Sequence, residues 1–325
     1  MSRYLLTGSA GFIASNVAHQ LLDLGHEVIG VDNMNDAYDV RLKTWRLEKL
    51  EERDGFIFFQ LDICDKDALA SVFDHEFDAV LNLAARAGVR QSVRDPWIYF
   101  QTNLTGALNL LDLSVKRGVS KFVQASTSSL YGSHNPRPFR ENADISKPLS
   151  PYAASKGASE MLCHSYHHLY GIDVTVLRYF TVFGPAGRPD MSIFRFVQWV
   201  AEGRPVIVYG DGHQERDFTY VSDIARGTIS AIQPVGFEVI NLGSDRPFVL
   251  LDVLRKIEAL LGKNAEIEWR DAAPADVRAT WADIHKAGEV LNWEPQISLE
   301  KGLEACIAWY ETERHWANQV NTSDA

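Results

Sequence analysis

Short apolar runs alternate with segments of helical periodicity throughout the first 180 residues of the chain. The apolar runs are RYLLTG (3–8), HEVIGVD (26–32), FIFFQLD (56–62), FDAVLNLAA (77–85), KFVQAST (121–127) and DVTVLRYF (173–180). Strands separated by helices pair in parallel through right-handed crossovers. Strands that are apolar along their whole length are typical of a sheet covered on both faces. The pattern therefore predicts an α/β fold with a doubly wound parallel sheet.

The second half of the chain is organised differently. The stretch FGPAGRPDMS (183–192) is rich in glycine and proline, and EVINLGS (238–244) has the composition of one more strand. We expect residues 1–180 to form a nucleotide-binding domain, to which residues 225–250 return. We expect residues 181–325 to form mainly a smaller, discontinuous substrate domain. Ligands of doubly wound folds bind outside the carboxyl ends of the strands, so the site is expected between the two domains.

Charge and cysteine usage argue against several classes of partner. The formal net charge is −11, whereas nucleic acids and anionic membranes bind basic surfaces, so we expect neither as a partner. No apolar run is long enough to span a bilayer. The three cysteines (Cys64, Cys163 and Cys306) are scattered and odd in number, which is typical of reduced thiols in a cytoplasmic protein.

A glycine-rich turn follows the first predicted strand and opens the first predicted helix. It has the pattern Gly8-x-x-Gly11-x-x-Ala14, and glycines there let backbone N–H groups approach a pyrophosphate. Asp32 ends the second predicted strand, where a carboxylate binds the hydroxyls of an adenosine ribose and repels a 2′-phosphate. The sequence therefore predicts a Rossmann-like domain that binds NAD rather than NADP. The alternative is a glycine turn and a capping aspartate that bind nothing.

A tyrosine and a lysine stand four residues apart in SPYAASK (150–156). Ser150 is a plausible N-cap and Pro151 a plausible first helical residue, which places Tyr152 and Lys156 on one helix face. A free tyrosine is a poor base at neutral pH, but a nearby ammonium favours the phenolate and lowers the tyrosine pKa. This spacing alone is common by chance and also fits a surface pair. Because it follows the glycine loop and the hydroxyl-rich strand end ASTSSLYG (125–132), it indicates a tyrosine that acts as a base.

Together these motifs resemble the extended short-chain dehydrogenase/reductase superfamily over essentially the whole chain. The further motifs are DN (32–33), LDICD (61–65), NLAA (82–85), NLTGALNLL (103–111), STSSLYG (126–132) and RDFTYVSDIARG (216–227). The resemblance implies a catalytic triad of Thr127, Tyr152 and Lys156, and tightly bound NAD. The NAD-binding residues it implies are Gly8, Gly11, Phe12, Ile13, Asp32, Asn33, Asp62, Ile63, Ala84, Ala85, Tyr152 and Lys156. It also implies a homodimer formed by the helices at 98–117 and 152–170.

Three stretches are similar to UDP-glucuronate 4-epimerases: DNMNDAYDVRLKTWRLEKL (32–50), AARAGVRQSVRDP (84–96) and FGPAGRPDM (183–191). A guanidinium is the natural bidentate partner of a sugar carboxylate. The similarity implies that role for Arg188, helped by Thr181, Ser128 and Ser129. The alternative is a loop arginine that pairs with Asp190.

For the nucleotide half of a UDP-sugar, the resemblance implies Arg216 as a phosphate contact and Asp276 as a uridine-ribose contact. Arg86 departs from the glutamine expected after LAA. It would add a second positive group near the carboxylate or merely face solvent, and the sequence leaves both open.

The expected reaction is interconversion of UDP-glucuronate and UDP-galacturonate by C4 epimerisation through a transient 4-keto sugar. Related decarboxylases and 4,6-dehydratases carry acids just before the strand-end tyrosine, where this chain has Ser128, Ser129 and Leu130. A 4-epimerase of a neutral UDP-sugar stays open, because it would not need Arg188. A catalytically idle relative would have lost Tyr152 or Lys156.

The spacing of the cysteine and histidines in CHSYHH (163–168) suits a metal ion. No further ligands are evident, so we expect no metal site.

Overall fold

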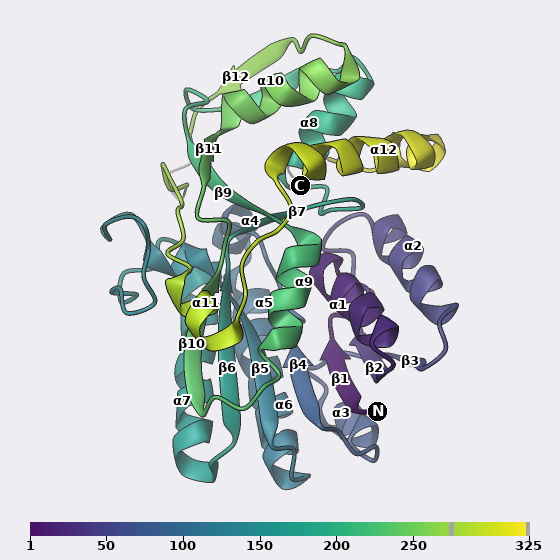
Figure 1. Cartoon of the computed structure of the whole chain (residues 1–325), viewed down its shortest axis with the longest axis vertical. Coiled ribbons are helices and arrows are strands. Elements are labelled where there is room, and N and C mark those ends of the chain that lie inside the picture. Colours follow the sequence, from purple (N-terminus) through teal and green to yellow (C-terminus); the bar gives the residue numbers. More distant parts are fainter. Residues whose placement is uncertain (273–275, 323–325) are drawn as a thin grey trace.

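The computed structural model describes residues 1–272 and 276–322 of the 325-residue chain. Seven strands form one parallel sheet: β1 (Arg3–Thr7), β2 (Glu27–Asp32), β3 (Phe56–Gln60), β4 (Ala79–Asn82), β5 (Lys121–Thr127), β6 (Asp173–Tyr179) and β10 (Phe237–Leu242). Their order is β10-β6-β5-β4-β1-β2-β3 (Figure 1). The predicted doubly wound α/β sheet is confirmed. The strand predicted at 238–244 is also present and lies at the edge beside β6.

Helices cover both faces of this sheet. They are α1 (Phe12–Asp23), α2 (Val40–Glu51), α3 (Lys66–Val72), α4 (Val89–Arg94), α5 (Pro96–Phe100), α6 (Gly106–Lys116), α7 (Pro151–Tyr170), α9 (Val221–Ser230) and α11 (His285–Leu291). Helices α1, α9 and α11 pack on one face, and α3, α6 and α7 on the other. Successive strand residues point to opposite faces, so Leu6 packs in the first core and Leu5 in the second. This double cover explains why the strands are apolar throughout.

The helix expected at 98–117 is interrupted. A π-helical turn at Gln101–Thr105 separates α5 from α6. The turn directs the buried side chain of Asn103 at two neighbours: its amide donates to the Arg86 carbonyl at 3.0 Å and to Ser155 Oγ on α7 at 2.9 Å. Single π-turns inside helices are frequent at functional sites, and this one fixes the chain after β4 against α7.

A second group of elements lies above the carboxyl ends of the main strands (Figure 1). It contains α8 (Ser192–Ala201), α10 (Leu250–Leu261) and α12 (Leu299–Ala317), which share one apolar core. Two small sheets join it, one in the order β11-β9-β7 and one of β12 with β8. Their strands are β7 (Thr181–Phe183), β8 (Val206–Tyr209), β9 (Glu215–Tyr220), β11 (Pro247–Val249) and β12 (Ile267–Arg270). Among the described residues, no helix combines the length and the apolar character needed to cross a membrane.

Helix α7 begins as the sequence predicted. The Ser150 hydroxyl accepts a hydrogen bond from the Ala153 N–H at 3.2 Å, and Pro151 is the first helical residue. The helix ends at Gly171, which adopts a left-handed conformation with φ of 71°. These two ends fix the register of the helix, and so the direction in which Tyr152 and Lys156 point.

Candidate active site

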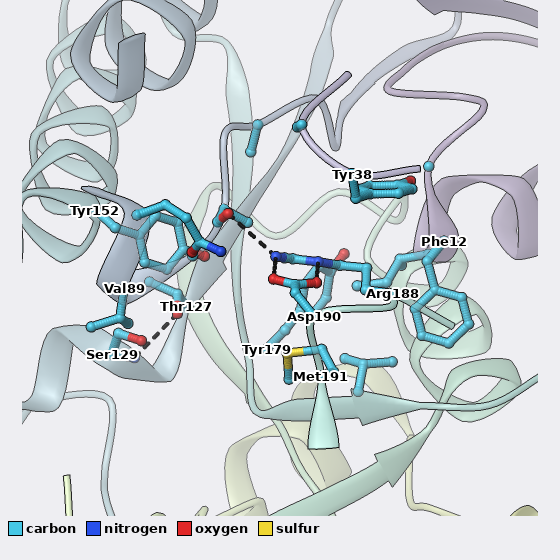
Figure 2. A pocket seen from close by; sticks show the side chains of 18 of the residues that line it. Phe12, Tyr38, Val89, Thr127, Ser129, Tyr152, Tyr179, Arg188, Asp190 and Met191 are labelled. Carbon is cyan, nitrogen blue, oxygen red and sulfur yellow. Dashed lines mark hydrogen bonds and ion pairs between the residues drawn. The ribbon is translucent and has the colours of Figure 1, made fainter. Parts of the chain in front are cut away.

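A cavity of about 530 Å³ lies between the carboxyl ends of the main sheet and the second group of elements (Figure 2). Every site residue predicted from the sequence lines it. These are Gly8, Gly11, Phe12, Ile13, Asp32, Asn33, Asp62, Ile63, Ala84, Ala85, Thr127, Ser128, Ser129, Tyr152, Lys156, Thr181, Arg188, Arg216 and Asp276. They come from segments almost 270 residues apart in the chain, so the fold brings them together.

The glycine loop lies at the start of α1. Gly8 has a φ of +71°, and a Cβ added there would approach the backbone of Ala84 to 2.9 Å. Its N–H donates to the Val31 carbonyl at 2.7 Å, and the Gly11 N–H donates to the Gly8 carbonyl at 2.7 Å. Because Gly11, the N-cap of α1, has no side chain, the first N–H groups of this helix face the cavity edge without a side-chain cap. Such a terminus attracts a phosphate group.

Two carboxylates follow at the ends of the next two strands. The Asp32 carboxylate is buried and accepts a hydrogen bond from the Met34 N–H at 2.8 Å and another from Lys43 Nζ at 3.4 Å. Asp62 accepts from the Asn33 amide at 2.8 Å. Burial alone would raise the pKa of Asp62, but hydrogen bonds from Cys64 and Asn33 outweigh burial and lower it. Both carboxylates are therefore held in place at the β2–β3 end of the cavity.

Lys43 was missed by the sequence analysis. It lies on α2 with its ammonium over the Tyr38 ring, 5.5 Å from the ring centre, and it also lines the cavity. A lysine eleven residues after Asp32 gives no signal by itself, because only the packing of α2 brings it back to the carboxylate.

Arg86 points toward the same end of the cavity. Its Nη1 lies 3.5 Å from the Asn35 amide oxygen, and its charge contributes to the lowered pKa of Asp62. The half-buried guanidinium thus lies near Asn35 and Asp62. Its charge also acts on Tyr99, as does that of Arg188, so a second positive group near the carboxylate stays a prediction.

Tyr152 and Lys156 both lie on α7 and line the cavity together with the strand-end Thr127. Figure 2 shows Tyr152 beside Thr127. Burial raises the pKa of Tyr152, while a hydrogen bond with Thr127 and the charge of Arg188 oppose that rise. Lys156 is 2% exposed, and burial lowers its pKa to about 8, against the opposing charge of Glu160. At Tyr152 burial thus outweighs the contacts with Thr127 and Arg188, and the Arg188 charge is the positive group that favours the ionised phenol.

The low pKa of Lys156 predicts a cost in stability. A lysine whose pKa falls from 10.5 to about 8 on folding penalises the folded state by about 3 kcal/mol below pH 8. The penalty disappears as pH rises to about 10.5, where the lysine is neutral in both states. We expect Lys156→Met to stabilise the ligand-free protein by roughly 1–3 kcal/mol at pH 7 and by much less at pH 10. Denaturant unfolding at both pH values measures this.

Lys147, which is exposed, provides the matched control for that experiment. Lys147→Met should leave the free energy of unfolding nearly unchanged at both pH values. A Lys156→Met protein that is less stable than wild type at pH 7 would show that the ammonium is not penalised by burial.

A buried charge pair supports the catalytic helix from behind. Glu160 lies one turn after Lys156, and its carboxylate pairs with Arg178 on β6 through contacts of 3.0 and 2.7 Å. It also accepts a hydrogen bond from Ser126 Oγ, next to Thr127. This pair joins α7 to β5 and β6, and so fixes Tyr152 relative to Thr127. The sequence analysis did not predict the Glu160–Arg178 pair. The four-residue spacing of Lys156 and Glu160 showed only that Glu160 shares the helix face of Lys156.

Arg188 crosses the cavity from the loop after β7. Figure 2 shows its guanidinium directed toward Tyr152 and Thr127, with Asp190 beside it. Nε and Nη2 donate to the two Asp190 oxygens at 3.0 and 2.5 Å, and Nη2 also donates to the Ala87 carbonyl at 3.3 Å. Burial would lower the pKa of Arg188, but Asp190 outweighs burial and raises it. Arg188 thus both pairs with Asp190 and faces the reacting end of the cavity.

The opposite end of the cavity carries two arginines, Arg90 and Arg216, and one carboxylate, that of Asp276. Arg90 donates to Asp276 at 2.6 Å, and its guanidinium lies 3.9 Å from the centre of the Tyr209 ring. Burial and the neighbouring Arg90 lower the pKa of Arg216, and Asp276 opposes them. With two positive groups against one negative group, this end favours an anion.

Comparison with known proteins assigns the family. The family model for the NAD dependent epimerase/dehydratase family matches residues 4–243. The chain belongs to this family. It is 53% identical to a UDP-glucuronate 4-epimerase of Thermodesulfobacterium geofontis over 95% of this chain and 96% of the relative.

Two solved structures of epimerases superpose on most of this family member. The Bacillus cereus UDP-glucuronic acid 4-epimerase, in complex with UDP-glucuronic acid and NAD, has a TM-score of 0.91 at 37% identity. The match covers 96% of this chain and 99% of that one. The Thermotoga maritima UDP-glucose 4-epimerase, with UDP-glucose, has a TM-score of 0.89 at 33% identity, with 96% and 99% covered.

Three side chains of the histidine-rich stretch at 163–168 are buried or have a contact within the protein. Cys163 is buried, the His164 ring packs edge-on against Phe237, and His167 Nδ1 lies 2.9 Å from the Ile172 carbonyl. Within the described part of this family member, no three histidine, cysteine, aspartate or glutamate side chains are arranged to hold a metal.

Proposed function

We propose that the chain is an NAD-dependent 4-epimerase that interconverts UDP-glucuronate and UDP-galacturonate. One observation supports this substrate most directly: Arg188 directs a guanidinium at the space beside Tyr152 and Thr127. A neutral sugar offers that guanidinium no charge to bind, whereas the C6 carboxylate of a glucuronate does. The 53% identical relative is itself a UDP-glucuronate 4-epimerase.

The residues around the glycine loop fit NAD. The uncapped start of α1 suits a pyrophosphate, the close approach of Gly8 to Ala84 leaves no room for a side chain, and Asp32 suits the ribose hydroxyls. Asn33, Asp62, Ile63 and Ala85 complete the walls. NAD held by these residues would supply the acceptor and donor of hydride for C4 of the sugar.

Tyr152 moves the proton of the sugar 4-hydroxyl. As a phenolate it takes this proton when C4 becomes a ketone, and it gives the proton back when the alcohol re-forms. Thr127 holds the phenol through its hydroxyl, and the positive charge of Lys156 favours the phenolate. The Glu160–Arg178 pair keeps the helix that carries both residues against β5 and β6.

Arg188 holds the carboxylate of the keto sugar. A 4-keto-glucuronate is a β-keto acid, which loses CO2 readily when the breaking bond aligns with the carbonyl π system. A carboxylate bound by Arg188 is kept out of that alignment, and Thr181, Ser128 and Ser129 line the same cavity. Because no carboxylic acid stands at Ser128, Ser129 or Leu130, this end of β5 offers no acid for elimination.

The nucleotide half of the substrate occupies the end with Arg90, Arg216 and Asp276. Arg216 and Arg90 balance the diphosphate, and Asp276 accepts from the uridine ribose. Because Asp276 pairs with Arg90 in the ligand-free protein, the diphosphate competes with Asp276 for that arginine.

Proton NMR of the purified protein tests this function. We expect UDP-glucuronate to give UDP-galacturonate, and UDP-glucose in a parallel tube to stay unchanged, with no net NADH or CO2. Conversion of UDP-glucose alone would establish a neutral-sugar 4-epimerase, like the Thermotoga maritima enzyme, and would overturn the assignment of Arg188. Release of CO2 would instead establish a decarboxylase.

We further propose a cytoplasmic homodimer. An exposed apolar surface extends over α4, α5, α6 and α7, which contact one another. Its residues are Val93, Trp97, Phe100, Leu108, Met161, Leu169 and Tyr170. Apolar patches of this kind mark protein interfaces, and two copies packed through these helices would cover it. The three free cysteines suit a reducing compartment.

Trp97→Lys tests the dimer, because Trp97, at 82% exposed, is the most exposed residue of this surface. We expect sedimentation equilibrium to give twice the chain mass for wild type, and the variant to dissociate at least about 30-fold more readily. Trp269→Lys, at a 53% exposed tryptophan on β12, is the matched control and should stay dimeric. A wild-type protein that sediments as a monomer contradicts the proposal.

A further inference from the structure

Arg46 is a buried arginine whose hydrogen bonds join three segments beside the cavity. It lies on α2, is 2% exposed, and is not part of the cavity wall. Nη1 donates to the carbonyl of Ala10 at 3.1 Å and to the Tyr38 hydroxyl at 2.8 Å. Nε and Nη2 donate to the carbonyl of Ala186 at 3.2 and 2.6 Å. The glycine loop, the loop before α2 and the loop that carries Arg188 therefore meet at one guanidinium.

The partners of Arg46 are all neutral. Buried charges in proteins are usually paired with an opposite charge, but within residues 1–272 and 276–322 no carboxylate lies within ion-pair distance of Arg46. A guanidinium presents five N–H donors in a fixed plane, so it holds several carbonyl groups in fixed directions at once. The contacts therefore indicate that Arg46 holds backbone in place.

The backbone that it holds is strained. Ala186, two residues before Arg188, has a φ of +49°, a left-handed conformation that is unfavourable for a residue with a Cβ. Such conformations persist where the surroundings determine them, and they cluster at ligand sites. Arg46 donates two hydrogen bonds to the Ala186 carbonyl and a weaker one to the Gly187 carbonyl at 3.4 Å. These bonds therefore help to hold the 186–188 segment in this shape.

The same segment also packs on the glycine loop. A Cβ added to Gly184 would lie 3.4 Å from the Phe12 ring, and one added to Gly187 would lie 3.8 Å from it. The Arg46 guanidinium lies 5.8 Å from the centre of this ring. Figure 2 shows Arg188 extending from the Phe12 side of the cavity toward Tyr152. Because Arg188 belongs to this segment, the contacts that hold the segment also set the direction of Arg188.

We propose that Arg46 is a positioning residue: it fastens the 186–188 segment to the glycine loop and thereby aims Arg188 at the sugar carboxylate. The inference rests on the proposed function of Arg188. It means that the preference for a glucuronate over a neutral sugar depends on a side chain that touches no part of the substrate.

Binding to the NAD-loaded Tyr152→Phe protein, which is expected to epimerise its substrate about 1,000-fold or more slowly, tests this inference. Calorimetry gives the dissociation constants of UDP-glucuronate and UDP-glucose, whose ratio measures recognition of the carboxylate. We expect Arg46→Met to weaken UDP-glucuronate binding by roughly 10-fold to 100-fold, and UDP-glucose binding by less than about 3-fold. Adding Arg188→Met to Arg46→Met should change the ratio little further, because both substitutions remove the same contact.

Two further variants separate positioning from general stability. Leu50→Ala, at a fully buried residue of the same helix, destabilises the fold without touching the 186–188 segment. In the Tyr152→Phe parent it should leave the ratio of the two dissociation constants unchanged. Arg46→Lys keeps the charge but loses the planar fork, so it should bind UDP-glucuronate as weakly as Arg46→Met, within about 3-fold.

The outcomes distinguish the inference from the proposed function. A parent protein that binds both nucleotide sugars equally would overturn the function of Arg188, and the role of Arg46 with it. A parent that prefers UDP-glucuronate, with the same ratio in Arg46→Met, would overturn only the role of Arg46. Equal weakening of both ligands would mean that Arg46 is merely structural, and would overturn it too.

Discussion

Tyr152→Phe is expected to reduce epimerisation about 1,000-fold or more while binding of UDP-glucuronate stays intact. The phenol is the one acid–base group on α7 that faces Thr127, and its removal leaves the proton of the 4-hydroxyl without an acceptor. Lys156, buried one turn away, cannot replace it because its ammonium is needed to favour the phenolate. The rate is measured by NMR, and binding by calorimetry.

Tyr99→Phe is the matched control for that loss. The Tyr99 ring packs edge-on against Tyr152 with ring centres 6.1 Å apart, so the variant changes the same surroundings by one hydroxyl. It should keep the rate within about 5-fold of wild type. If Tyr152→Phe keeps a tenth or more of the wild-type rate, another group transfers the proton and the assignment of Tyr152 is wrong.

Arg188→Met is expected to cost about 100-fold or more in kcat/KM for UDP-glucuronate. The variant loses the charged contact to the carboxylate and leaves the keto sugar free to lose CO2. We therefore expect a fraction of the turnovers to end in CO2 release with NADH left on the protein, detected by absorbance at 340 nm. Full activity and affinity for UDP-glucuronate in this variant would refute the carboxylate role.

The same variant has a predicted pH dependence. The Arg188 charge lowers the pKa of Tyr152, so its removal lets that pKa rise. Because the base form of Tyr152 is required, the rise of kcat/KM with pH should move to higher pH in Arg188→Met. A profile that moves to lower pH, or not at all, would show that Arg188 does not act on Tyr152.

Asp190 requires a control of its own, since Arg188→Met leaves this half-buried carboxylate without its partner. The double variant Arg188→Met/Asp190→Asn removes the whole pair and should show the same loss of activity, with stability closer to wild type. Asp190→Asn alone frees Arg188 from its internal competitor and should bind UDP-glucuronate at least as tightly as wild type.

Much of this site was predictable because its signals are local. The alternation of strands and helices gave the doubly wound sheet, and the glycine loop lies where a strand turns into a helix. Tyr152 and Lys156 share a helix face because they are four residues apart, and Ser150 caps that helix as expected. Local spacing and turn chemistry fix such features before any tertiary contact forms.

The alternative interpretation of Arg188, a pair with the nearby Asp190, was also local, and the structure contains this pair. Arg188 pairs with Asp190, two residues away, yet it also lines the cavity beside Thr127 and Tyr152. The two interpretations therefore do not exclude each other. The sequence presented them as alternatives because it does not show which way the loop faces.

By itself, then, the sequence determined the parallel sheet, the glycine turn, the position of Asp32 at a strand end, and the helix face shared by Tyr152 and Lys156. Only the tertiary structure decided which distant side chains support them: Lys43 beside Asp32, Arg178 with Glu160, and Arg46 against the loop of Arg188. The physical reason is that backbone periodicity acts over a few residues. Contacts such as that between Arg46 and Ala186, 140 residues apart, exist only after the elements have packed.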